Sequence, residues 1–411
     1  MTTEVIIKNK SGLVLAADSA VTVTGIGMDG KQAKVYNSAN KLFTLSKIAP
    51  VGVLLYNSSS INDIPAEIII KEFREKGDTF NNLKQYHDAL IKFIENFLKE
   101  NASCNGIFEF FEAFCNIFIS IASKEKEELK ENFTYSAFIT KQIEQIKSLC
   151  YYLGCPTEIS GINALYINEK LTTDKKIIKK YSEFQEQSGY TGTIDTISDL
   201  FYEFFRLRIC QSYTGIAVCG YGKKEFFPKV YRIHIYGLIE NHLLTGDLIS
   251  HEGKDAEIIP LAQKQMIDTF IKGVSDKLYE NLEELYFQNF NSFIEAITPS
   301  LKEGVDSEEI RTRLSKAFAN NAEFFKKIVF ETEEAPLIQT VSHLSREEMA
   351  ELAESLINIQ VLKYKVSPEL ETVGGPIDVA IISKHDGFVW RKRKLYFPKE
   401  LNFQFFENYF K

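Results

Sequence analysis

The sequence lacks any apolar stretch long enough to cross a membrane. A membrane-spanning helix needs about 20 consecutive apolar residues, whereas the longest apolar run, residues 107–122, is interrupted by Glu109, Glu112 and Asn116. Residues 1–20 also lack the basic start and apolar block of a secretory signal. These two absences predict a cytoplasmic protein that makes no membrane contact.

Cysteine, proline and tryptophan are all scarce. The chain of 411 residues holds six Cys, ten Pro and one Trp, against 32 Phe and 19 Tyr. Because a long chain without a secretory signal keeps its thiols reduced, we expect free core cysteines and no disulfide framework. Cys150 and Cys155 have no second Cys or His cluster near them in the sequence, so they do not predict a zinc site. No metal and no organic cofactor are implied.

Positive charge is in deficit. The 48 Lys and Arg residues face 56 Asp and Glu residues, which gives a net charge of −8. Because a nucleic-acid surface needs an excess of basic residues, this balance argues against a nucleic-acid partner. Hydrophobic residues make up 45% and charged residues 25% of the chain, as in an ordinary globular protein. We therefore expect a folded chain with a large buried core.

Strand-like and helix-like patterns follow one another in blocks. The first sixty residues favour strands, and helical patterns dominate from residue 64 to about 208. Strands are expected again over 212–248, a second helical block over about 255–335, and two last strands over 376–396. A capping box at Ser345 predicts a further helix that ends near Lys363. This order alone favours an α+β fold.

The first eighteen residues carry the strongest functional signal. Met is usually removed before a small residue, which would make Thr2 the first residue of the mature chain. A free N-terminal threonine carries a nucleophilic hydroxyl and a base, since its α-amine has an unperturbed pKa near ~8. Strand patterns over 4–7 and 13–17 flank a turn at 9–12. Folding about that turn places Asp18 opposite the threonine, give or take one residue.

A second hairpin is expected from the strand patterns over 41–45 and 51–56. Its geometry puts Lys41 at an open strand end beside Tyr56 and Asn57. A buried lysine next to the α-amine would lower the pKa of that amine and so favour the free base. With the N-terminal threonine and the acid opposite it, this lysine predicts a nucleophilic site.

These stretches resemble the N-terminal-nucleophile hydrolases of the proteasome type, above all proteasome β subunits and bacterial proteasome-like peptidases. Carried over to this chain, the resemblance makes Thr2 the nucleophile, Asp18 the orienting acid and Lys41 the cationic helper. The matching stretches are Thr2-Thr3, Gly12–Ser19, Asn40–Leu45 and Gly52–Asn57, with weaker matches at Thr214–Gly220 and Gly374–Ile382.

The resemblance also implies an architecture and an assembly. The fold would be a four-layer αββα sandwich with large helical insertions. Family members act inside rings, so the resemblance implies a homo-oligomer, a peptide or protein substrate, and an ATPase or other regulator as a candidate partner. The expected parts are a core over 1–76, 209–250 and 340–397, a mainly helical insertion over 77–208, a helical segment over 251–339 that is partly core and partly insertion, and an aromatic tail over 398–411.

The other site motifs of the family are altered in this chain. Ser58 and its neighbours stand where the family has a Gly-Gly pair whose backbone N–H serves the oxyanion, although another loop could supply such a group. A helix N-cap or a polar loop is an equally good interpretation of these serines. The candidates for the oxyanion site and substrate pocket are Tyr56, Asn57, Ser58 and Ser59, and the candidates for a supporting acid or hydroxyl are Glu252, Glu371 and Thr372.

The leading interpretation is a threonine-type peptidase or amidohydrolase. The altered motifs also fit a catalytically inactive proteasome-fold scaffold or binding protein. A small-molecule amidase with the same nucleophile is a third alternative, and it would need a closed pocket in place of a ring chamber.

Overall fold

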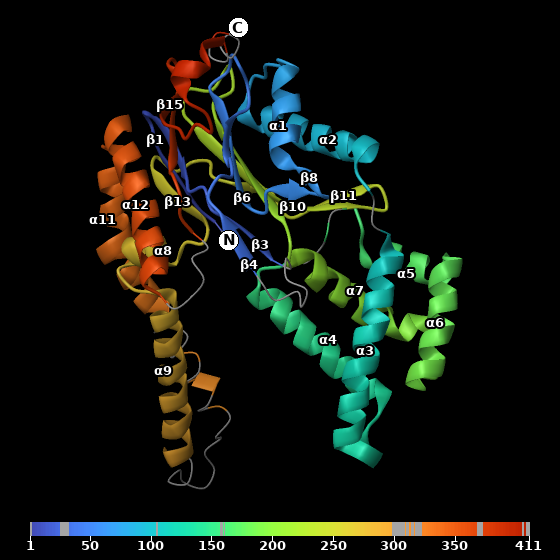
Figure 1. Cartoon of the computed structure of the whole chain (residues 1–411). Helices are drawn as coiled ribbons and strands as arrows, with labels where there is room; N and C mark the ends of the chain where they lie inside the picture. Colours follow the sequence, from blue (N-terminus) through green and yellow to red (C-terminus); the bar gives the residue numbers. More distant parts are fainter. Residues whose placement is uncertain are drawn as a thin grey trace. The chain divides into compact units, whose positions relative to one another are not determined.

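The computed structural model describes most of the chain (Figure 1). Its elements fall into two compact units. Both units combine helices with antiparallel strands, which confirms the α+β class. The four-layer αββα sandwich would be formed by the two units together, and it stays a prediction. The first unit comprises Met1–Leu42, Phe226–Pro228 and Gly253–Lys411, and the second Phe43–Glu225 and Lys229–Glu252. The described residues are 2–24, 33–103, 106–156, 159, 161–297, 309, 312–313, 316, 323–367, 373–404 and 407.

The first unit is built on a five-stranded antiparallel sheet in the order β13-β1-β2-β14-β15. Its interior strands β1 and β2 are buried along their whole length, although only β2 is apolar throughout and β1 also buries Thr3, Glu4, Lys8 and Asn9. The strands are β1 (Thr3–Asn9), β2 (Gly12–Ala17), β13 (Glu257–Ala262), β14 (Asp378–Ser383) and β15 (Gly387–Lys392).

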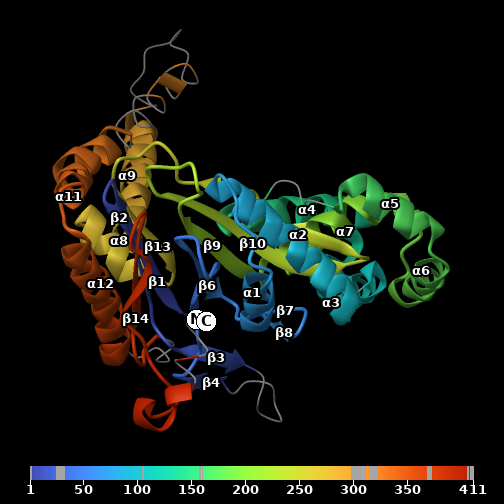
Figure 2. The same cartoon turned by 90° about the horizontal axis from the view of Figure 1, so that it is seen from above.

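Helix α12 (Arg346–Val366) covers this sheet and contacts β1, β2 and β14; Figure 2 shows it running along the strands. Its capping box is formed as expected, with Ser345 accepting from the Glu348 N–H and Glu348 accepting from the Ser345 N–H. Met349, Ala350, Ala353, Leu356 and Ile357 of α12 pack on Val5, Ile7, Val14 and Ala16 of the sheet. Other helices of the unit are α8 (Gln265–Lys272), α9 (Asp276–Ile297) and α11 (Ala335–Val341), with a π-turn at Phe330–Glu334.

Strand β13 corrects the expectation of a helix from about residue 255. Residues Glu257–Ala262 pair with β1, and Ile259 lies opposite Ile6. Pro260 would interrupt a helix, but an edge strand tolerates it because its missing N–H faces away from the ladder. The short apolar run is therefore better read as a strand that completes the sheet beside β1.

The second unit holds the other large sheet, in the order β11-β10-β9-β6-β5, with β12 beside β10. Helix α2 packs against β9 and β10 and also contacts α1. The structure thus puts α2, which the sequence assigned to the insertion, on the sheet. The elements are β5 (Leu42–Thr44), β6 (Val51–Asn57), β9 (Thr214–Gly220), β10 (Lys229–Ile239), β11 (His242–Thr245), β12 (Ile249–Ser250), α1 (Ala66–Glu75) and α2 (Leu83–Asn101).

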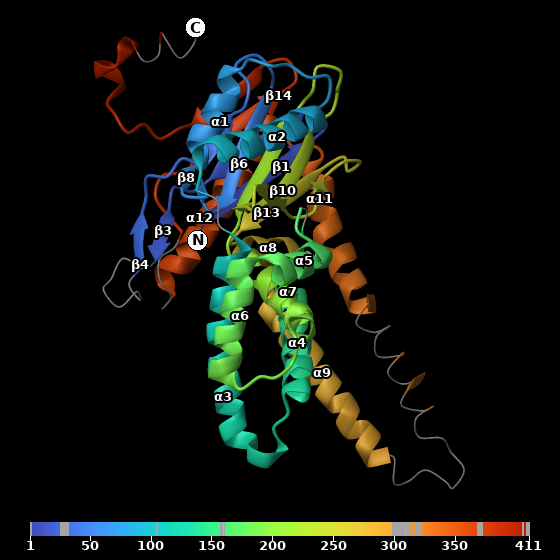
Figure 3. The ribbon, with the colours of Figure 1, turned by 90° about the vertical axis from the view of Figure 1, so that its right-hand side faces the viewer.

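A helical cluster with its own aromatic core forms the rest of the second unit. The rings of Phe111 and Phe201 pack edge to face with their centroids 5.3 Å apart, and those of Phe118 and Phe138 do so with their centroids 5.1 Å apart. Figure 3 shows α3 beside α6. The phenylalanines of residues 107–122 thus pack within the chain. The helices are α3 (Ile107–Leu129), α4 (Tyr135–Tyr152), α5 (Ala164–Thr173), α6 (Lys175–Ser188) and α7 (Ile194–Cys210).

Several smaller features complete the description. The five described cysteines are free thiols. No helix in the described part of the chain is both long and apolar enough to cross a membrane. The remaining elements are the strand pairs β3 (Val21–Thr24) with β4 (Ala33–Tyr36) and β7 (Ser60–Ile61) with β8 (Ile64–Pro65), and the 3-10 turns Lys130–Asn132 and Lys399–Leu401.

Replacing Phe111 by alanine is expected to destabilise the protein by about 3–5 kcal/mol, because the ring is fully buried and its removal leaves a cavity in the helical cluster. The same replacement at Phe226, which is 82% exposed, is expected to change the free energy of unfolding by less than about 0.5 kcal/mol. Urea denaturation followed by circular dichroism measures both. Equal effects would contradict the packing described.

Candidate active site

The β1–β2 hairpin sets the geometry at the start of the chain. Glu4 lies opposite Ala17, so the next pair outward is Thr3 with Asp18. The Asp18 N–H donates to the Thr3 carbonyl at 3.2 Å, and the Thr3 N–H donates to Asp18 Oδ1 at 3.1 Å. Asp18 therefore lies one residue from the position opposite Thr2, within the margin expected from the turn.

Lys41 joins this hairpin through a buried ion pair. Its ammonium group contacts Asp18 Oδ1, and Glu4 Oε1 lies 3.4 Å from the same Nζ atom. All three side chains are buried. Burying an isolated charge is unfavourable, so a lysine here depends on the acids that surround it. The sequence predicted the pairing of Lys41 with Asp18 but not the second acid.

Asp18 is held by backbone groups as well as by the lysine. Its Oδ2 accepts from the Gly374 N–H at 2.9 Å and from the Ala20 N–H at 3.4 Å. The neighbouring Ser19 donates its hydroxyl to the Pro376 carbonyl at 2.5 Å. Several fixed donors leave the Asp18 carboxylate little freedom to turn away from Lys41.

A glycine pair before β14 makes this approach feasible. Gly375 has a φ of +77°, a backbone conformation that other residues rarely adopt. A Cβ atom added there would lie only 2.8 Å from the Cβ of Asn37. The sequence singled out Gly374 and Gly375 as part of the last family-like stretch; the structure gives the first of them a direct contact with Asp18.

Thr2 lies beside these groups at the start of β1. It is only 3% exposed, and its carbonyl accepts from the Gln263 N–H at 2.9 Å. Residues two apart in a strand face the same side of the sheet, which places the side chains of Thr2 and Glu4 together. The Thr2 side chain interacts with the Glu4 carboxyl group. The structure thus gathers Thr2, Glu4, Asp18 and Lys41 at one end of the hairpin.

Glu4 is the residue of this group that sequence reasoning missed. Burial raises the pKa of its carboxyl group to about 8, even though Lys41 acts in the opposite direction; the negative charge of Asp18 adds to the rise. The Lys41 contact at 3.4 Å is longer than a strong charge-assisted hydrogen bond. Burial therefore favours the protonated form of this carboxyl group near neutral pH. The available signal was an acid two residues after Thr2, directly before the apolar run Val5–Ile7 of the same strand.

The candidate oxyanion and pocket residues belong to the second unit, at and after the end of β6. The Tyr56 ring is buried against Tyr213, and the Asn57 side-chain amide donates to the Tyr213 carbonyl at 2.9 Å. The Ser58 hydroxyl donates to the Ser60 carbonyl at 3.1 Å, and the Ser59 carbonyl accepts from the Ala66 N–H at 2.9 Å. Their role as oxyanion donors or pocket walls stays a prediction.

The interpretation of these serines as a helix N-cap is wrong. Helix α1 begins after Pro65, and no side chain caps it. Ser58 and Ser59 instead form a polar loop between β6 and β7, and Ser60 begins β7.

The three candidates for a supporting acid or hydroxyl are not brought to Thr2 by any described contact. Glu252 lies in the second unit, where it pairs with Lys229 at 3.0 Å and accepts from the Tyr231 hydroxyl. Glu371 and Thr372 lie outside the described residues. Among the residues that are described, no group of three or more His, Cys, Asp or Glu side chains is arranged to hold a metal ion.

Comparison with known proteins adds little to this geometry. No protein-family model and no curated protein matches the chain. Among solved structures, the chain is similar to a mutant form of Anbu from Hyphomicrobium sp. strain MC1, with a TM-score of 0.31 and 11% sequence identity. That alignment covers 100% of this chain and 91% of the Anbu chain. A likeness at this TM-score carries no argument about fold or activity.

The stability of the protein is expected to fall as the pH rises from 4.5 to about 8. In this window unfolded Glu4 has lost its proton while folded Glu4 keeps it, so the folded state binds more protons. The Glu4 contribution is complete below pH 4.5 and is lost above about pH 8, with a slope of up to about 1.4 kcal/mol per pH unit. Urea denaturation across this window measures it.

Glu4→Gln is expected to flatten that slope, because the amide does not titrate. The matched control is Glu347→Gln, whose side chain is 76% exposed and which should keep the slope of the parent. The same slope in the parent and in Glu4→Gln would contradict the raised pKa of Glu4.

Proposed function

We propose that this protein is an N-terminal threonine hydrolase that cleaves peptide or amide bonds once Met1 has been removed. The observation that carries the proposal is the buried Lys41–Asp18 ion pair at the strand end where Thr2 lies. A buried lysine fixed by an acid supplies positive charge beside a residue that can be both nucleophile and base.

The reaction proposed begins with attack of the Thr2 hydroxyl oxygen on the carbonyl carbon of the substrate. The α-amine of Thr2 takes the hydroxyl proton and later gives it to the departing amine. The acyl group then sits on Thr2 as an ester. A water molecule, deprotonated by the same α-amine, hydrolyses the ester and restores the free hydroxyl.

Lys41 has two tasks in this scheme. Its positive charge lowers the pKa of the nearby α-amine, so that more of the amine is free base near neutral pH. The same charge stabilises the negative charge that develops on oxygen during attack. Asp18 positions the lysine, and its backbone partners keep it there. Backbone N–H groups around Asn57–Ser59 are proposed as the oxyanion donors.

Glu4 sets the charge balance of the proposed site. When its carboxyl group is protonated, the charges of Lys41 and Asp18 cancel and the lysine faces no second carboxylate. When Glu4 ionises, near pH 8, the group gains a negative charge that opposes an oxyanion. A neutral Glu4 therefore suits the mechanism.

The assembly implied by the family resemblance is proposed with the chemistry. It comprises a homo-oligomer, a peptide or protein substrate and a regulatory partner such as an ATPase. Native mass spectrometry of the purified protein measures the number of subunits, and a monomer would remove this part of the proposal without touching the chemistry.

Thr2→Ala is expected to lower hydrolysis of peptide amides on the order of 10³-fold or more, because it removes the nucleophile. Thr2→Ser is expected to keep part of the activity, since serine supplies both a hydroxyl and an α-amine. Both variants keep a small residue after Met1, so removal of Met1 stays permitted. Casein and a panel of fluorogenic peptide amides serve as substrates, and circular dichroism checks folding.

Two outcomes would contradict the proposed function. One is activity of Thr2→Ala equal to that of the parent. The other is a folded parent protein that has lost Met1 and hydrolyses none of these substrates.

A further inference from the structure

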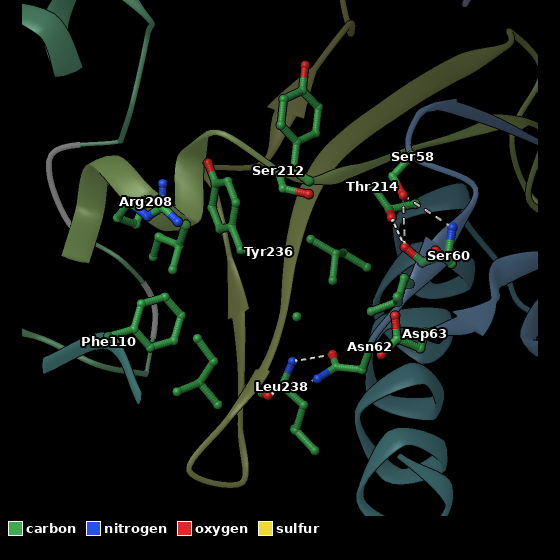
Figure 4. Close-up of a pocket in the computed structure, with 16 residues that line it drawn as sticks. Ser58, Ser60, Asn62, Asp63, Phe110, Arg208, Ser212, Thr214, Tyr236 and Leu238 are labelled. Carbon is green, nitrogen blue, oxygen red and sulfur yellow. Dashed lines mark hydrogen bonds between the residues drawn. The ribbon is translucent and has the colours of Figure 1, made fainter. Parts of the chain in front are cut away.

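A cavity of about 270 Å³ lies in the second unit; Ser58 of the proposed oxyanion loop lines it, whereas Thr2, Glu4, Asp18 and Lys41 do not (Figure 4). Helix α7, strand β10 and the turn between β7 and β8 form its walls. The charged and phenolic side chains that line it are Asp63, Arg208, Tyr213 and Tyr236. The cavity is smaller than the usual drug-sized pocket of about 300–1,000 Å³, so it suits a small molecule.

One wall is an irregular part of β10. The register with β11 shifts between Ile235 and Gly237, so Tyr236 is left in a bulge and contributes its side chain to the cavity. Gly237 has a φ of +122°, which favours glycine, and a Cβ atom there would lie 2.9 Å from Asn62 Oδ1. The bulge thus directs the Tyr236 side chain to the cavity, and Gly237 lets the β7–β8 turn pack close to β10.

The opposite wall is fixed by Asn62. Its Oδ1 accepts from the Leu238 N–H at 2.7 Å, and its Nδ2 donates to the Leu238 carbonyl at 3.1 Å. Asn62 and Asp63 both have positive φ values, of 46° and 63°. These bonds tie the turn to β10, so the Asp63 backbone is held at the rim of the cavity before any ligand arrives.

Two opposite charges face this cavity without pairing with each other. Among the described residues, the Arg208 side chain donates one hydrogen bond, to Gln211 Oε1 at 3.4 Å, and it forms no ion pair within them. Asp63 has neither an ion pair nor a side-chain hydrogen bond in the described part of the chain. Figure 4 shows Arg208 on the α7 side and Asp63 on the side of the turn, with the cavity between them.

A ligand that satisfies both charges must carry a carboxylate at one end and an ammonium group at the other. Arginine binds carboxylates through paired N–H groups, and a carboxylate such as Asp63 is the complement of an ammonium group. The hydroxyl groups of Tyr236, Ser58 and Ser212 line the same cavity and add neutral polar partners. Both charged residues are exposed, so a ligand can reach them.

We propose that this cavity binds a small zwitterion, a free amino acid or a dipeptide, with the carboxylate on Arg208 and the ammonium group on Asp63. The proposal rests on the residues of the cavity alone and holds whether or not Thr2 is catalytic. Free amino acids and short peptides are also the class of product that a peptidase releases.

Isothermal titration calorimetry with the full chain tests the proposal. The probes are the twenty standard L-amino acids and alanyl-alanine. At least one is expected to bind with a Kd between about 10 μM and 1 mM, the range of a small polar ligand held by few contacts. Its N-acetylated and its C-amidated forms are expected to bind at least tenfold more weakly, because each loses one charge-assisted contact.

Two substitutions assign the ends of the ligand. Arg208→Gln is expected to bind the zwitterion at least tenfold more weakly than the parent does, and to bind the zwitterion and its C-amidated form equally well. Asp63→Asn is likewise expected to bind the zwitterion at least tenfold more weakly, and to bind the zwitterion and its N-acetylated form equally well. The matched controls are Arg313→Gln and Asp247→Asn, exposed residues outside the cavity, which should bind as the parent does.

Three results would overturn the proposal. They are a parent protein that binds none of the probes more tightly than about 10 mM, binding that neither substitution weakens, and equal binding of the free and the blocked forms. Circular dichroism shows that each variant is folded, so a loss of binding reports on the cavity.

Discussion

A lysine buried between two acids is the interaction on which the start of this chain depends. Lys41, Asp18 and Glu4 are all buried, and the charges of Lys41 and Asp18 stabilise each other there. The hairpin supplies the acids, and the chain before β5 supplies the lysine. Gly374, far along the chain, closes the arrangement through its N–H to Asp18. Removing either Lys41 or Asp18 leaves the charge of the other buried and uncompensated.

The second acid makes this group electrostatically unusual. Two ionised carboxylates around one lysine would carry a net negative charge inside the protein. Burial instead favours the protonated form of Glu4, so Lys41, Asp18 and Glu4 together carry a net charge near zero at neutral pH. The same protonation links stability to function. The form of Glu4 that stabilises the fold is the one that leaves Lys41 free to act on Thr2 in the proposed mechanism.

Much of the N-terminal geometry was readable from the sequence because it is local. A short hairpin fixes its own register, so the turn at 9–12 was enough to bring Asp18 to within one residue of Thr2. The start of α12 was equally readable from its capping box. Glu4 was missed because an acid at a strand end is usually solvated, and only the tertiary fold buries it.

Features that depend on distant partners could not be read in this way. Strand β13 was mistaken for helix because the short run Glu257–Ala262 shows its nature only when β1 lies beside it. The cavity of the second unit needs the bulge at Tyr236 and the bonds from Asn62 to Leu238, two segments 176 residues apart. No local sequence pattern predicts strand β13 or this cavity.

The central claim is that Thr2 becomes a free N-terminal nucleophile beside Lys41. Exposure to a peptidyl epoxyketone, which needs both the amine and the hydroxyl of such a threonine, followed by intact mass and peptide mapping, tests it most directly. The account predicts loss of Met1 and a single adduct on Thr2, with no adduct in Thr2→Ala or in a folded Lys41→Ala variant. Retention of Met1, or a free Thr2 that stays unmodified, would contradict it.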